Sequence, residues 1–195
     1  FEATAWNNIG ISYRGLKKYA EAKQAIEKAL AINKKNGASQ EKAFNYNNLG
    51  HIYSDQKEYQ SAIEYINKAL EINRTLHNRY EEIQNLNNLS RVYLELHNYT
   101  ITEKYLRYTE NLLNEFPSNQ LKLNNVLHFG NYYTKLQDYK NAVKYKDIYI
   151  ALRDSLLFAN RKNQFNQLKT LANTEKEIQK VAFLGKINSI QEEKI

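Results

Sequence analysis

The chain has 195 residues, 42% of them hydrophobic, and a formal net charge of +7. One proline and six glycines argue against a turn-rich β protein, and the lack of cysteine excludes disulfides, thiolate metal sites and cysteine nucleophiles. No run reaches the roughly eighteen apolar residues that a membrane span requires. Lys and Arg alternate with Asp and Glu instead of forming a basic stripe, which argues against nucleic acid as a partner.

Equivalent residues recur every forty residues along the chain. One column of tyrosines contains Tyr13, Tyr53, Tyr93 and Tyr133, and a second contains Tyr19, Tyr59, Tyr99 and Tyr139. A long period that repeats without slippage predicts stacked supersecondary units rather than one folded-back globule. We expect four units, at about residues 3–40, 43–80, 83–120 and 123–152.

Each unit is predicted to be a helix pair. In the first, Ile9 and Tyr13 belong to one stretch with three- and four-residue apolar steps, and Ala22 and Ile26 belong to a second stretch with a new phase. Gly37 suits a left-handed stop after the second helix. Small residues should let the paired helices approach closely, with Gly10, Gly50 and Gly130 opposite Ala22, Ala62 and Ala142. The fourth unit is weaker, since Lys146 stands at an apolar position.

The pattern resembles the tetratricopeptide repeat over about residues 3–152. The residues that carry the resemblance are Trp6, Ile9, Gly10 and Tyr13 in the first helix and Tyr19, Ala22, Ile26 and Ala29 in the second. It implies an all-α fold, a right-handed α-solenoid of antiparallel helix pairs, acting as a protein- or peptide-binding scaffold. Two departures stand out: the closing proline is absent except for a displaced Pro117, and the family's turn glycine is replaced by Lys17, Lys57, His97 and Gln137.

Residues 153–195 lack the second-helix signature and are expected to form a long capping or coiled-coil-like helix, a candidate for homodimer formation. Repeats followed by such a helix resemble the sensor region of bacterial membrane-bound tetratricopeptide histidine kinases and related helix-turn-helix regulators. That resemblance implies a membrane span and an output region beyond Ile195, which this chain would lack. The repeats would then lie on the periplasmic side of the inner membrane, and otherwise in the cytoplasm.

No catalytic, metal or cofactor site is expected. The four histidines show no metal-ligand spacing, and no phosphate loop or nucleophile–base motif occurs. The fragment is therefore interpreted as a non-enzyme, although a full-length protein could carry a kinase domain.

In the family, the first helix of each pair lines the concave face, which implies where a peptide would lie. Carboxamides there could pair with a peptide backbone, and Arg91 is the natural partner for a carboxylate. The alternatives are asparagines that bond only between neighbouring helices, a self-association module without a groove ligand, and nucleic-acid binding through the positive charge. The candidate peptide-binding residues are Asn7, Asn8, Asn47, Asn48, His51, Asn87, Asn88, Arg91, His128 and Asn131.

Overall fold

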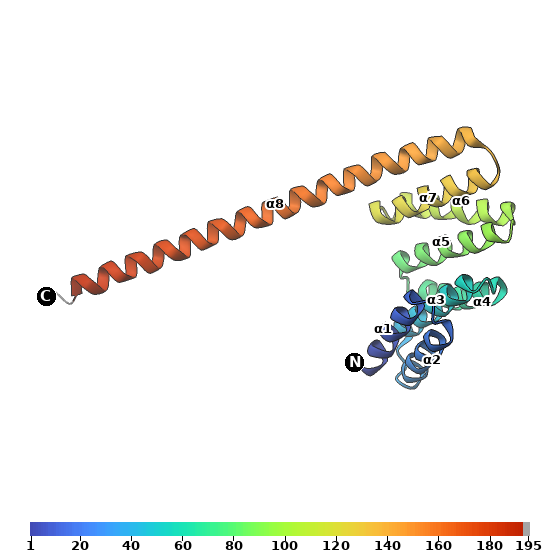
Figure 1. Ribbon diagram of the computed structural model, residues 1–195, viewed down its shortest axis with the longest axis horizontal. Helices are drawn as coiled ribbons and strands as arrows, with labels where there is room; N and C mark the ends of the chain where they lie inside the picture. The colour runs from blue at the N-terminus through green and yellow to red at the C-terminus, as the bar shows by residue number, and fades with distance from the viewer. Residues whose placement is uncertain (193–195) are drawn as a thin grey trace. The chain divides into compact units, whose positions relative to one another are not determined.

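The computed structural model describes the backbone of residues 1–192 and the side chains of residues 1–182, and within that range it contains helices and no strand (Figure 1). The helices are α1 (Glu2–Gly15), α2 (Tyr19–Lys35), α3 (Ser39–Asp55), α4 (Tyr59–Thr75), α5 (Arg79–Glu95), α6 (Tyr99–Glu115), α7 (Asn119–Lys135) and α8 (Tyr139–Glu192). Consecutive helices run antiparallel; α1 to α6 pack as three pairs, each on the next, α7 packs on α5 and α6, and the start of α8 contacts α7 through Tyr145 and Phe129. The predicted all-α solenoid of helix pairs is thus confirmed.

Two residues after the end of each first helix stands a residue with a left-handed backbone. The φ angles are 58° at Lys17, 63° at Lys57, 56° at His97 and 60° at Gln137. In each turn the amide of the following residue donates to the carbonyl of the first tyrosine column, as from Lys18 to Tyr13 at 2.9 Å. This bond closes the helix end in the manner of a Schellman turn. The positions at which the sequence departs from the family's glycine are therefore the ones that adopt the glycine conformation.

Glycine in the first helix allows close approach in the first two hairpins. A Cβ atom on Gly10 would lie 2.5 Å from Ile26 Cδ1, and one on Gly50 would lie 2.5 Å from Ile66 Cγ1. At Gly130 the nearest atom would be Tyr145 Cβ at 3.9 Å. The expected Gly–Ala approach is therefore correct for the first two hairpins and wrong for the fourth, where Ala142 lies beyond contact distance.

The core follows the repeat. Buried side chains of neighbouring helices form clusters around Ile26 and Leu49, around Ile66 and Leu86, and around Leu106 and Phe129. Tyrosines of both columns pack against these clusters. The single tryptophan, Trp6 on α1, has the Lys28 ammonium of α2 over its ring, 4.3 Å from the centroid.

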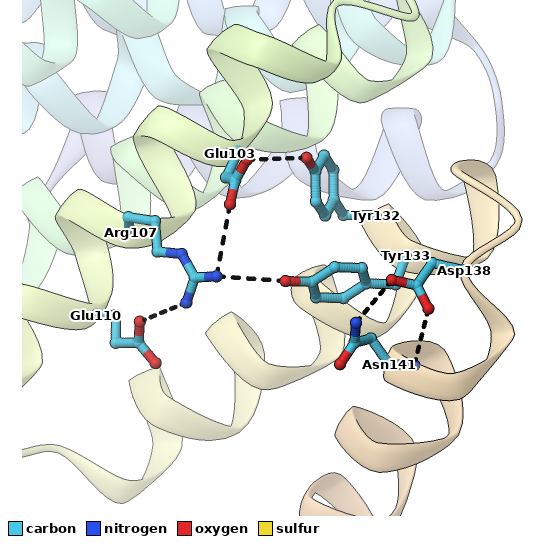
Figure 2. A network of polar contacts seen from close by, with 7 residues as sticks. All are labelled: Glu103, Arg107, Glu110, Tyr132, Tyr133, Asp138 and Asn141. Carbon is cyan, nitrogen blue, oxygen red and sulfur yellow. Dashed lines mark hydrogen bonds and ion pairs between the residues drawn. The ribbon is translucent and has the colours of Figure 1, made fainter.

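A polar network attaches α7 to α6 (Figure 2). The Arg107 guanidinium donates to Glu110 at 3.2 Å and to the Tyr133 hydroxyl at 3.3 Å, and it lies 4.9 Å from the Phe129 ring centroid. The Tyr132 hydroxyl donates to Glu103 at 3.2 Å. Because Arg107, Glu103 and Glu110 are 44–46% exposed, their ion pairs contribute little to stability, whereas the Tyr132 side chain is buried.

α8 continues past the end of the fourth hairpin. Residues 1–149 form one compact unit, and the part of α8 from Ile150 onward forms a second. The helix is unbroken at residue 152, so the predicted repeat limits and the separate role of residues 153–195 stay predictions. Within residues 1–192, no helix combines the length and the apolar character needed to cross a membrane.

Candidate functional site

Asparagine side chains connect the first helices of successive pairs. Asn33 Nδ2 donates to Asn45 Oδ1 at 2.8 Å, and Asn45 Nδ2 donates to Asn7 Oδ1 at 2.9 Å. Asn48 Nδ2 donates to the same Asn7 oxygen at 2.9 Å. The Asn7 oxygen thus accepts two bonds, which is the capacity of a carbonyl oxygen.

The same relay recurs one unit later. Asn73 donates to Asn85 at 2.8 Å, and Asn85 and Asn88 donate to Asn47 Oδ1 at 3.0 and 3.1 Å. In the next unit Leu113 replaces the first asparagine. Asn125 Nδ2 donates to Asn87 Oδ1 over a longer distance, 3.4 Å. In this unit Asn125 Nδ2 also donates to the Leu106 carbonyl at 3.2 Å, so the relay is weaker there than in the first two units.

Sequence reasoning missed the connecting residues of this relay. Their spacing is a usable signal, because all five recur at the forty-residue period of the chain, in two columns. What the sequence alone does not supply is the offset between neighbouring helices, which decides which columns meet. The missed residues are Asn33, Asn45, Asn73, Asn85 and Asn125.

His51 and Arg91, forty residues apart, are brought into direct contact. Arg91 Nη2 lies 3.2 Å from His51 Nδ1, and the carboxamide nitrogens of Asn47 and Asn88 lie 3.4 and 3.3 Å from His51 Nε2. Guanidinium only donates, so His51 Nδ1 accepts and the ring proton belongs on Nε2. That proton then faces two amide nitrogens, and the cluster holds more donors than acceptors.

Burial keeps both inward histidines neutral. Burial, with the nearby charges of Arg14 and Arg91, lowers the pKa of His51 to about 3. Burial, with the charge of Arg91, lowers the pKa of His128 to about 4. At neutral pH the positive charge of this surface therefore comes from the arginines.

The two arginines differ in their partners. Arg14 Nε donates to Asp55 Oδ2 at 2.6 Å, which satisfies its charge. Arg91 is half-buried, its burial lowers its pKa, and among the described residues it forms no salt bridge. Asn87, one turn earlier, is 3% exposed and its Nδ2 has no hydrogen-bond partner within the described part of the chain. Arg91 stands where His51 stands in the previous unit, and it offers Asn87 no acceptor.

The other candidate residues form no hydrogen bond with this cluster among the described residues. Asn8 and Asn131 are exposed, and His128 is half-buried on α7. Asn7 and Asn48 border a cavity of about 260 Å³ between α1 and α3, together with Ile11 and Phe44. The structure thus brings together Asn47, His51, Asn88 and Arg91, while ligand binding by any of the ten candidates stays a prediction.

Across residues 1–182, no three histidine, aspartate or glutamate side chains cluster in a way that could hold a metal ion. The cluster around His51 offers hydrogen-bond donors and one guanidinium charge, which suits recognition of an acceptor.

Solved structures with this fold include BtubC (BKLC) from P. vanneervenii (18% identity, TM-score 0.67), aspartyl phosphate phosphatase F from Bacillus subtilis (15%, 0.72) and the apo form of RapI (18%, 0.69). Each match covers 79% of this chain but only 64%, 40% and 56% of the respective neighbour. The chain therefore spans less than two thirds of these proteins, and at such identities the likeness shows the fold alone. The search among curated proteins gave no match.

The family is shown by sequence. A tetratricopeptide repeat family model matches residues 1–75 and 41–107, which together make up more than half of the 195 residues. Families of this fold are generally scaffolds for protein interaction. With the helix pairs, the turn geometry and the family match in agreement, the chain belongs to the tetratricopeptide repeat family.

Proposed function

We propose that this non-enzymatic scaffold binds a protein or peptide segment that carries a carboxylate, with Arg91 as its anchor. The observation that carries the proposal is the state of Arg91: its half-buried guanidinium contacts the His51 ring and no carboxylate among the described residues. A partly desolvated arginine gains most from a carboxylate that can accept two parallel bonds.

The asparagines leave donors for the rest of the ligand. Asn48 and Asn88 each use their amide nitrogen on a neighbouring asparagine oxygen, and each NH₂ group has a second hydrogen, which in Asn88 finds no acceptor at the protonated His51 Nε2 beside it. In the proposal these hydrogens donate to backbone carbonyls of an extended peptide. Backbone pairing tolerates many sequences, while Arg91 selects for the acid.

The decisive variant is Arg91→Gln. The probes are pairs of labelled, terminally blocked peptides that differ only by Glu against Gln, measured by fluorescence anisotropy on the full chain. The native protein should prefer the Glu member by at least about tenfold, and Arg91→Gln should abolish that preference. Arg153→Gln removes an exposed arginine of α8 and should leave the preference intact. An unchanged preference in Arg91→Gln would overturn the assignment.

We also propose that the scaffold is the interaction or sensing region of a larger bacterial signalling protein. Its support is the order of repeats followed by a long polar helix, together with the partial coverage of structural neighbours. The full-length gene product tests this directly. A membrane span and a kinase or DNA-binding domain after Ile195 would support it and favour the periplasmic placement, and their absence would contradict it.

A further inference from the structure

The distal part of α8 carries apolar side chains that nothing in the described chain covers. Every residue from Leu157 to Ala182 is exposed. A helix held only by its own backbone bonds gains little stability in water, so exposed apolar residues along it indicate a missing partner. The large apolar residues are Leu157, Phe158, Phe165, Leu168, Leu171, Ile178 and Val181, which are 48–71% exposed.

These residues gather on one side of the helix. At about 100° per residue, all of them except Val181 fall in a sector of about 160° centred near Leu168. Arg161 and Glu175 lie within about 20° of the middle of that sector. They stand seven residues before and seven residues after Leu168, so they share its heptad column.

We call this sector, from Leu157 to Ile178 and including Arg161 and Glu175, the stripe. Its spacing makes it complementary to a second copy of itself in one orientation. In an antiparallel pair centred on Leu168, residues equally distant from that leucine lie at the same height on the two helices. Arg161 then lies opposite Glu175 of the second copy, and the twofold axis forms this ion pair twice. Apolar residues also share heights, with Phe165 level with Leu171 and Phe158 level with Ile178, so each level of the pair carries an apolar side chain on both flanks of the seam.

The parallel orientation lacks this complementarity. In register, it places Arg161 against Arg161 and Glu175 against Glu175 within the apolar seam, where like charges oppose association. We infer that two copies of this chain pair through residues 157–179 of α8 as an antiparallel coiled coil centred on Leu168. The occupant of the stripe is thus the same stripe on another molecule.

This inference goes beyond the proposed peptide function and does not rest on it. The paired stripe and the Arg91 cluster have no residue in common. Arg91→Gln should leave the dimer intact, and disruption of the dimer should leave the Glu preference intact. Failure of either proposal is therefore distinguishable from failure of the other.

Orientation is tested with cysteines, which the natural chain lacks. Gln164 and Ala172 lie at equal distances from Leu168, so they face each other only in the antiparallel pair. In the 195-residue chain, the variants Gln164→Cys and Ala172→Cys should form a disulfide-linked dimer when they are mixed, and little dimer when each is oxidised alone. Efficient crosslinking of each variant with itself would show a parallel pair and overturn the inference.

Charge swaps test the interface itself, with molecular mass followed by sedimentation across a concentration series. Arg161→Glu or Glu175→Arg alone should raise the dimer dissociation constant by about tenfold or more, and the double swap should restore it. Lys162→Glu makes the same charge change outside the apolar sector, about 120° from its centre, and serves as the matched control. Circular dichroism should show that each variant retains its helix content. A native protein that stays monomeric, or a double swap that fails to restore pairing, would overturn the inference.

Discussion

The second hairpin (α3 with α4) and the fourth (α7 with residues 139–149) carry glycine at the same position, yet only the second is closely packed. Gly50 faces Ile66 at a distance that leaves no room for a Cβ atom, whereas Gly130 has ordinary space around it. Lys146 occupies the place of Ile66 and is exposed, and Val143 is 57% exposed where Ile63 is 9% exposed. A cavity of about 440 Å³ lies between α7 and the start of α8.

The difference teaches that the second helix decides the packing. The first-helix signature is intact in both hairpins, including the glycine and the tyrosine three residues later. A lysine cannot be buried without a partner, so it keeps its helix face at the surface and leaves the glycine unfilled.

The largest expected contrast comes from truncating the residue opposite the glycine. Ile66→Ala should lower the free energy of unfolding by about 2–5 kcal/mol, because Ile66 is fully buried and its loss leaves a cavity. Lys146→Ala should change it by no more than about 0.5 kcal/mol, as for other exposed sites. Urea unfolding followed by circular dichroism measures both. Equal losses would show that the fourth hairpin is packed like the second.

Adding a methyl group to each glycine sharpens the same contrast. Gly50→Ala should destabilise by about 1–3 kcal/mol, since the new Cβ would overlap Ile66. Gly130→Ala should stabilise by up to about 1 kcal/mol, because alanine is the better helix former and space is available. The thermal midpoint should therefore move in opposite directions, and a shift of the same sign in both would contradict this.

Acid should separate the two hairpins through their histidines. The pKa of His51 is lowered to about 3 and that of His128 to about 4, against an ordinary value of 6.5. Below pH 6.5 the unfolded chain therefore binds more protons than the folded chain. The free energy of unfolding decreases as the pH is lowered, by at most about 1.4 kcal/mol per pH unit for each histidine. The loss continues to about pH 3 for His51 and ends near pH 4 for His128. Unfolding measured from pH 7 to 3 should show a smaller acid-induced loss of stability in both His51→Gln and His128→Gln than in the native chain. The reduction should be larger for His51→Gln.

The smallest effect should be common to both hairpins. Lys57→Gly and Gln137→Gly should each stabilise by about 0.5–1 kcal/mol, because both positions have a positive φ that glycine adopts without strain. Comparable gains in chemical denaturation would show that the turns are equivalent and that the hairpins differ in packing alone. A gain at one turn only would contradict that interpretation.

The helix pairs and their turns were predictable because they depend on short-range patterns. The first tyrosine column marks the end of each first helix, and Gly37 has the left-handed conformation expected of it, with φ of 67°. The His51–Arg91 contact follows from their shared column once helices of successive units lie side by side. The bonds from Asn33 to Asn45 and from Asn45 to Asn7 could not be predicted in this way, because they join residues at different positions of the repeat. Lys146 at an apolar position already indicated that the fourth hairpin would be weaker. The space beside Gly130 could be found only from the structure.

The position of Trp6 beneath Lys28 gives the first hairpin its own optical reporter. As the chain holds one tryptophan and sixteen tyrosines, indole emission reports on one end of the stack and phenol absorbance on its whole length. Because each unit contacts only its neighbours, a stack that opens stepwise separates the two signals, whereas an all-or-none transition superimposes them.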